Sequence, residues 1–303
     1  MQSKLNYLKV FSLLISYLFT VSAPEVSAQS TNPYGFEIEI TGEGEPVLFF
    51  PGLISSGEVW AETVSKFSDR YESHVFTMPG YAGVPPVETE SYLETWKTGI
   101  TEYIDSENLK QVTLVGHSLG GFLSLWIAIE NHHAVKQIIV VDALPFYAGL
   151  MNPNAETGFN EEAANQYMNS FAQMNDEQRF ATRMRIAQGM TNNSDKWKTI
   201  AQWSVDSDLK TEAWTATEML GIDLRDNISK IEIPVLVLGA YNENQQFPDY
   251  TLEYMKQSYT SQYKNLRTFE FEVAEGAGHF IMFDKPDWMH REISTFMNNQ
   301  SDQ

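Results

Sequence analysis

Short runs of consecutive apolar residues alternate with longer segments of helical periodicity along most of this chain. The apolar runs have the length and the turn-forming boundaries of strands buried on both faces of a sheet. They lie at 47–50, 75–78, 112–115, 138–141 and 234–238, with further strands indicated at 36–40 and 268–273. Helical spacing of apolar residues is found at 58–67, 92–104, 119–131, 249–263 and 286–297. Buried strands separated by helices predict an α/β fold, with a mostly parallel sheet covered by helices on both faces.

This alternation stops between residues 145 and 230. The stretch has no buried-strand pattern and consists of polar helical segments rich in Met, Gln and Asn, with Trp197, Trp203 and Trp214 at intervals. An insertion of roughly 85 residues is too long for a plain loop inside a compact domain. We therefore expect a helical cap over 145–230, inserted into a core formed by 29–144 and 231–303.

The first 28 residues differ from the rest of the chain. Lys4 and Lys9 precede an apolar run at 10–21, and small residues lead to Ala28. This order is typical of a secretory signal peptide, and the run is short for a membrane span. We expect cleavage near Ala28 and export to the periplasm or the medium, with no stable membrane anchor afterwards. An uncleaved N-terminal anchor is the alternative.

Composition excludes several classes of protein. Of 303 residues, 43% are hydrophobic and none is cysteine, so the chain is globular and has no disulfide, thiolate metal site, iron–sulfur cluster or cysteine nucleophile. The formal net charge is −20. Because such a surface repels phosphate groups, we expect neither a nucleic acid nor an anionic membrane as a partner.

One motif carries a candidate nucleophile. The sequence Gly-His-Ser-Leu-Gly-Gly at 116–121 lies between the predicted strand at 112–115 and the helix that follows it. A sharp strand-to-helix turn of this type exposes its serine, here Ser118, and needs Gly116 and Gly120 for close backbone approach. The start of the helix presents free N–H groups beside Ser118. The alternative is a glycine-bracketed turn with an idle serine.

A serine hydroxyl needs a base to accept its proton, and six histidines are available. His279 follows the last predicted strand, in a loop that contains two glycines, at the edge where ligands gather in open α/β sheets. We therefore predict His279 as the base. His132 and His133 could form a metal pair, but adjacent residues on a helix face apart and no third ligand is near in sequence.

The order of elements, the elbow at 116–121, the inserted cap and the late Gly-x-Gly-His loop resemble the α/β-hydrolase family over nearly all of residues 34–298. The resemblance implies an oxyanion hole made by the backbone N–H groups of Leu53 and Leu119. The early loop of that family commonly has a His-Gly turn, whereas this chain has Pro51-Gly52. A different side chain at residue 51 does not remove the backbone N–H groups of Leu53 and Leu119.

The acid of the triad is less easily assigned. The resemblance points to a carboxylate just after the strand at 234–238, where this chain has Asn242, followed by Glu243. Some capped members carry the acid one strand earlier, and there Asp142 ends the strand at 138–141. We predict Asp142 as the acid, with Glu243 as the alternative. A capping role for Asp142 is also open.

These assignments predict an exported serine hydrolase that cleaves a carboxylic ester or a related acyl bond, with no metal, nucleotide or organic cofactor. Tyr81, Phe146 and Tyr147 are expected to overhang the site and to favour an apolar acyl or alcohol group. Ser118 argues against the dehalogenases and epoxide hydrolases of this fold, which use a carboxylate nucleophile. A peptidase, a perhydrolase, a carbon–carbon bond hydrolase and an inactive ligand-binding protein remain alternatives.

Overall fold

The computed structural model describes residues 33–130, 133–150, 152–243 and 251–301. The predicted signal peptide at 1–28 and the candidate metal ligand His132 lie outside the described residues. Within them, no helix is both long and apolar enough to cross a bilayer.

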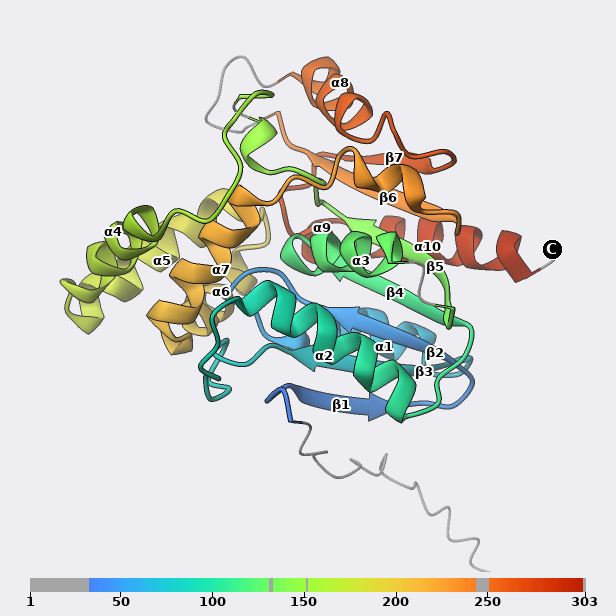
Figure 1. Ribbon diagram of the computed structural model, residues 1–303, viewed down its shortest axis with the longest axis horizontal. Helices are drawn as coiled ribbons and strands as arrows, with labels where there is room; N and C mark the ends of the chain where they lie inside the picture. The colour runs from blue at the N-terminus through green and yellow to red at the C-terminus, as the bar shows by residue number, and fades with distance from the viewer. Residues whose placement is uncertain (1–32, 131–132, 151, 244–250, 302–303) are drawn as a thin grey trace, which may run out of the picture.

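A seven-stranded sheet forms the centre of the fold (Figure 1). Its strands lie in the order β1-β3-β2-β4-β5-β6-β7, and every neighbouring pair is parallel except β1 and β3. The strands are β1 (Glu37–Thr41), β2 (Glu45–Phe50), β3 (Tyr71–Thr77), β4 (Val112–His117), β5 (Val135–Val141), β6 (Val235–Tyr241) and β7 (Glu270–Glu275). The predicted α/β fold with a mostly parallel sheet is confirmed.

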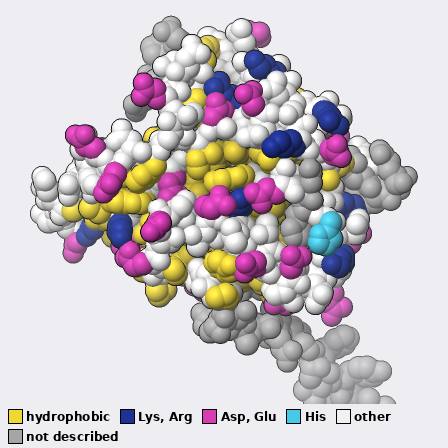
Figure 2. Space-filling view, in the orientation of Figure 1, with side chains coloured by type: hydrophobic (Ala, Val, Ile, Leu, Met, Phe, Trp, Pro, Cys, Tyr) yellow, Lys and Arg dark blue, Asp and Glu magenta, His cyan; other side chains and the backbone are white. Residues whose placement is uncertain are grey.

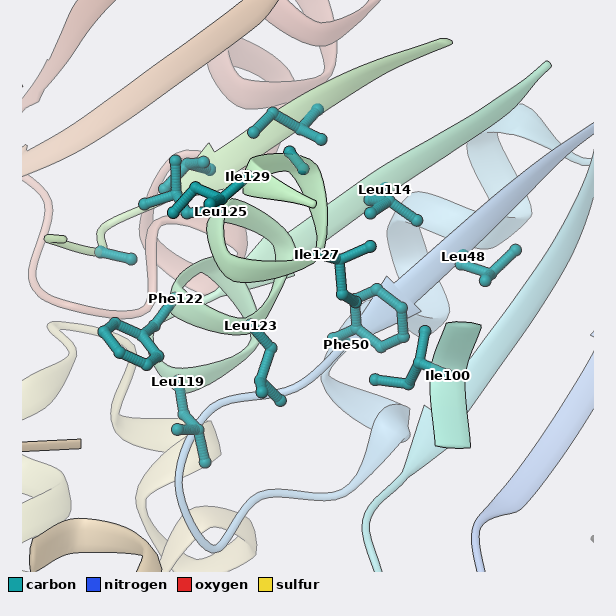
Figure 3. Packing of buried hydrophobic residues seen from close by; sticks show 14 of the residues in the cluster. Leu48, Phe50, Ile100, Leu114, Leu119, Phe122, Leu123, Leu125, Ile127 and Ile129 are labelled. Carbon is teal, nitrogen blue, oxygen red and sulfur yellow. The ribbon is translucent and has the colours of Figure 1, made fainter. Parts of the chain in front are cut away.

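Helices cover both faces of this sheet (Figure 1). Alternate residues of β2 show the two layers: Leu48 and Phe50 belong to one apolar cluster, and Val47 and Phe49 to the other. The first cluster includes α2 (Tyr92–Ser106), α3 (Leu119–Ile129) and α8 (Leu252–Gln262), and Figure 3 shows its side chains between β2, β4, α2 and α3. The second includes α1 (Ala61–Phe67), which follows the 3₁₀ turn η1 (Gly57–Trp60), α9 (Ile281–Asp284) and α10 (Pro286–Ser301).

The segment between β5 and β6 is helical. After the short turn η2 (Ala148–Leu150), it contains α4 (Glu161–Ala172), α5 (Asp176–Met190), α6 (Ser194–Asp206) and α7 (Leu209–Gly221), and it ends at the turn η3 (Asn227–Lys230). Each of α4 to α7 begins after an Asn or Asp whose side chain accepts a hydrogen bond from the first turn, which fixes where the helix starts. The four helices group together beside the body that contains the sheet (Figure 1).

A buried ion pair joins three of these helices. Arg183 of α5 donates to both carboxylate oxygens of Glu212 of α7, at 2.8 and 2.5 Å, and Tyr167 of α4 donates to the same carboxylate at 2.5 Å. The side chains of Arg183 and Glu212 are 2% and 0% exposed. Neither charge can be solvated if its partner is removed, so the pair constrains how the helices pack.

We expect Glu212→Ala to lower the free energy of unfolding by about 3–5 kcal/mol, because it leaves the Arg183 guanidinium buried without a counter-charge. The double variant Arg183→Leu/Glu212→Leu should lose clearly less, since no charge then remains in the interior. Urea denaturation of both variants measures the difference. A double variant at least as unstable as Glu212→Ala would contradict this account.

Candidate active site

Ser118 stands at a sharp turn between β4 and α3. Its backbone is left-handed, with φ 51° and ψ −117°, a conformation rare for residues other than glycine. The turn is possible because a Cβ on Gly116 would lie 2.2 Å from the backbone of Gly120, and one on Gly120 would lie 2.4 Å from the carbonyl oxygen of Phe50. The two glycines thus let α3 start directly against β4 and β2, with Ser118 raised at the turn.

Asp142 lies next to this turn, directly after β5. In the parallel register of β4 and β5, His117 is paired with Val141, so Ser118 and Asp142 are the next residues on neighbouring strands. One oxygen of the Asp142 carboxylate accepts hydrogen bonds from the Ala240 N–H at 2.7 Å and from the Tyr259 hydroxyl at 2.6 Å. Its orientation is therefore fixed by two donors from other elements.

The second carboxylate oxygen of Asp142 accepts from Nδ1 of His279 at 2.6 Å. In the neutral imidazole, this bond places the proton on Nδ1 and leaves Nε2 as an acceptor, as a general base requires. The side chain of His279 is 26% exposed, and that of Asp142 is 12% exposed. The imidazole thus remains open to a bound molecule while its carboxylate partner is shielded.

His117 ties the loop of His279 to the turn that carries Ser118. Its Nε2 donates to the carbonyl oxygen of His279 at 3.0 Å, and the two rings are 4.5 Å apart. Burial lowers the pKa of His117 well below its usual range, so the ring is neutral at pH 7. This role of His117 could not be predicted from the sequence, because the contact joins residues 162 positions apart.

The predicted oxyanion loop lies against the same turn. A Cβ on Gly52 would be only 3.2 Å from Cβ of Ser118, so the backbone before Leu53 passes directly beside the serine. The N–H groups of Leu53 and Leu119 have no hydrogen-bond partner within the described part of the chain. Two unpaired backbone donors beside Ser118 can stabilise a negative oxygen there.

The structure separates the two candidate acids. His279 contacts Asp142, whereas Glu243 is exposed after the end of β6. The side-chain amide of Asn242 donates to Oδ1 of Asn192 at 2.8 Å, a contact with the turn between α5 and α6. Asn242 therefore has a structural partner of its own.

Two of the three predicted pocket residues do not line an open site, which corrects that expectation. Tyr81 is 0% exposed and its hydroxyl is 2.5 Å from that of Thr215. Phe146 is also 0% exposed and packs under the guanidinium of Arg225, 4.6 Å from its ring centre. Both aromatic rings therefore fill the interior: Tyr81 lies against α7, and Phe146 lies under Arg225, which follows α7. The pattern of aromatic residues after strand ends could not distinguish packing from ligand contact.

Tyr147 alone of the three is partly exposed. Its hydroxyl oxygen is enclosed and lacks a well-aligned hydrogen-bond partner among the described residues. Burial raises the pKa of Tyr147, while the adjacent Ser118 hydroxyl acts to lower it. The group is therefore a protonated donor next to Ser118.

Comparisons with known proteins identify the family of this chain. The sequence matches the alpha/beta hydrolase family over residues 47–292. It is 24% identical over 208 residues to a pimeloyl-(acyl-carrier protein) methyl ester esterase of Vibrio cholerae, covering 66% of this chain and 76% of that protein. A shorter match, 27% identical over 103 residues, relates it to (E)-2-((N-methylformamido)methylene)succinate hydrolase of Acinetobacter baylyi, covering 34% of this chain and 39% of that protein.

A solved esterase structure from Exiguobacterium antarcticum has the same fold. It superimposes with a TM-score of 0.71 at 18% sequence identity, covering 87% of this chain and 95% of that one. The sheet order and the strand-to-helix turn define the class as an α/β hydrolase fold. Because the family match spans most of the sequence, the chain belongs to the alpha/beta hydrolase family.

We expect Gly120→Ala to lower the free energy of unfolding by about 2–3 kcal/mol, because the new methyl group collides with the backbone of Phe50. Gly189→Ala is a matched control. Gly189 lies near the end of α5 with nothing within 4 Å of an added Cβ, so this change should stabilise by about 0.5–1 kcal/mol through helix propensity. Thermal or urea denaturation tests both. Equal effects of the two changes would show that the turn is not sterically constrained.

Proposed function

We propose that this chain is a serine hydrolase that cleaves a carboxylic ester or a related acyl bond. Ser118 is the nucleophile, His279 the general base and Asp142 the acid that orients the histidine. The observation that carries this proposal is the 2.6 Å bond from His279 Nδ1 to Asp142, formed beside a left-handed serine. This arrangement presents Nε2 of His279 as the proton acceptor.

In the proposed reaction, Nε2 of His279 takes the proton of Ser118 while Oγ bonds to the acyl carbon. The carbonyl electron pair moves to the carbonyl oxygen, which the N–H groups of Leu53 and Leu119 stabilise. When the tetrahedral intermediate collapses, the bond to the leaving alcohol breaks and the alcohol takes the proton from His279. Water then attacks the acyl-enzyme by the same steps and frees Ser118.

The relatives support acyl chemistry, since the named Vibrio protein is a methyl ester esterase. Acidic side chains are scattered over the visible face of the molecule (Figure 2), and the chain has a formal net charge of −20. We therefore propose, as the substrate, a small-molecule ester that carries no negative charge. We also propose that the protein acts after export, on the basis of the sequence pattern at 1–28.

A fluorophosphonate probe tests the proposal directly, because it labels only an activated serine. Wild-type protein should be labelled and should hydrolyse p-nitrophenyl esters of some chain length, whereas Ser118→Ala should do neither. A folded wild-type protein that resists labelling and hydrolyses none of the esters would favour a ligand-binding role for the fold.

We expect Asp142→Asn to lower kcat by about 10⁴-fold, the typical cost of replacing the acid of a triad by its amide. Glu243→Gln should leave kcat within about twofold of the wild type, because a substitution on the exposed surface rarely affects the interior. Ester turnover of the two variants measures this. If Glu243→Gln causes the larger loss, the assignment of the acid is wrong.

Tyr147→Phe tests whether the tyrosine hydroxyl contacts the substrate. We expect kcat/KM to fall about tenfold, the effect of one hydrogen bond worth about 1.4 kcal/mol. Stability should not fall, because the hydroxyl has no well-aligned partner within the described residues. Tyr103→Phe is the control: that hydroxyl bonds Nδ1 of His74 at 2.7 Å, so stability should fall and turnover should not. Wild-type turnover in Tyr147→Phe would exclude the contact.

A further inference from the structure

Asp284, the last residue of α9, joins two parts of the chain through one carboxylate. On one side, it accepts hydrogen bonds from the Thr191 hydroxyl at 2.5 Å, from the Asn192 N–H at 3.0 Å and from the Asn193 N–H at 3.2 Å. These three residues form the turn between α5 and α6. On the other side, it accepts from the N–H of Gly278 at 2.7 Å. Gly278 is the residue immediately before His279.

Two further contacts join the same turn to the same loop. The side-chain amide of Asn192 donates to the carbonyl oxygen of Gly276 at 2.9 Å, and the Phe280 N–H donates to the carbonyl oxygen of Met190 at 3.2 Å. A Cβ on Gly278 would lie 2.5 Å from that Met190 oxygen, so the two backbones are in direct contact. The turn between α5 and α6 therefore packs on the loop of His279 along its whole length.

These contacts hold the backbone of His279 on both sides. Gly278 before it is held by Asp284, Phe280 after it by Met190, and its own carbonyl oxygen by His117. The ring is then aligned by a single side-chain bond, from Nδ1 to Asp142. Since that bond requires the backbone to be correctly placed, the position of the base depends on the inserted helices as well as on the core.

We propose that Asp284 is a positioning residue, which fixes the His279 loop by linking Gly278 to the turn at 191–193. The inference rests on the proposed function of His279 as the base. A carboxylate suits this place because all its neighbours are donors: three N–H groups and one hydroxyl converge on two acceptor oxygens. An asparagine in the same place would have one oxygen and one NH₂ group. The NH₂ group would face either the donors of residues 191–193 or the N–H of Gly278, and those donors would lose their acceptor.

Asp284→Asn is the test. We expect kcat to fall about 10- to 100-fold with KM changed less than about threefold, because a displaced base weakens the reaction more than substrate binding. The second readout is the downfield proton resonance of His279 Nδ1–H, assigned by its loss in Asp142→Asn. In Asp284→Asn this resonance should shift or broaden in folded protein.

Asp208→Ala is the matched control. Asp208 accepts from the Thr211 N–H at 2.7 Å and the Thr211 hydroxyl at 2.8 Å at the start of α7, and so stabilises the inserted helices without contacting the His279 loop. Loss of this cap should cost about 1 kcal/mol of stability. Turnover and the His279 resonance should stay as in the wild type. A comparable fall of kcat in Asp208→Ala would show that Asp284→Asn acts through general destabilisation and not through the His279 loop.

Wild-type kcat together with an unchanged His279 resonance in Asp284→Asn would overturn the proposal. If Asp284→Asn does not fold, Thr191→Val serves as the test, because it removes only one of the four donors to Asp284. A fall of kcat smaller than that expected for Asp284→Asn would support the positioning role, and an unchanged kcat would oppose it. Failure of the proposed function looks different: wild-type protein would show no turnover and no labelling of Ser118. The resonance would then still report whether Asp284 positions His279.

Discussion

The left-handed backbone at Ser118 is the constraint around which the site is assembled. Such a conformation costs about 1–3 kcal/mol for a residue with a side chain and persists only where the surroundings enforce it. Ser118 lies where β4 ends and α3 begins. Gly116 and Gly120 let these two elements approach more closely than any residue with a Cβ would permit. The Ser118 N–H is bonded to the carbonyl oxygen of Val141 at 2.9 Å, so the strained residue is anchored to the neighbouring strand. The fold holds the serine in place before any substrate arrives.

A similar backbone conformation, with a similar bond to the next strand, places Asp142, the proposed acid. Asp142 is also left-handed, and its N–H bonds the carbonyl oxygen of Leu238 at 2.7 Å, as the Ser118 N–H bonds Val141 one strand earlier. With the carboxylate supplied by β5, the position after β6 no longer has to be acidic. Asn242 occupies this position, and its side-chain amide donates a hydrogen bond to Oδ1 of Asn192, which a carboxylate could not do. An amide at this position therefore does not conflict with the proposed triad of Ser118, His279 and Asp142.

The sequence predicted what depends on local pattern and missed what depends on distant contact. The strands were recognisable because each is a short apolar run with clear boundaries, and Ser118 and His279 because they follow strands at the edge where such sites form. Asp142 and Glu243 could not be separated with certainty, since the choice depends on which carboxylate faces His279. Tyr81 and Phe146 were misassigned because an aromatic residue after a strand can fill the interior equally well. Asp284 gave no signal at all: its partners are up to 93 positions away.

The link through Asp284 also bears on what kind of lid the inserted helices form. Within the insert, the buried pair of Arg183 and Glu212 ties α5 to α7, and charges so enclosed do not separate without a large cost. The junction with the His279 loop is made of hydrogen bonds that are partly buried or exposed, and four of them go to the charged Asp284 carboxylate, where each is worth about 1.5–3 kcal/mol. A displacement of the insert would then be transmitted to the loop as a whole, because Asp284 concentrates four of those bonds on one carboxylate next to the base. A cap fastened in this way couples its own position to the alignment of His279, which a freely hinged lid would not do.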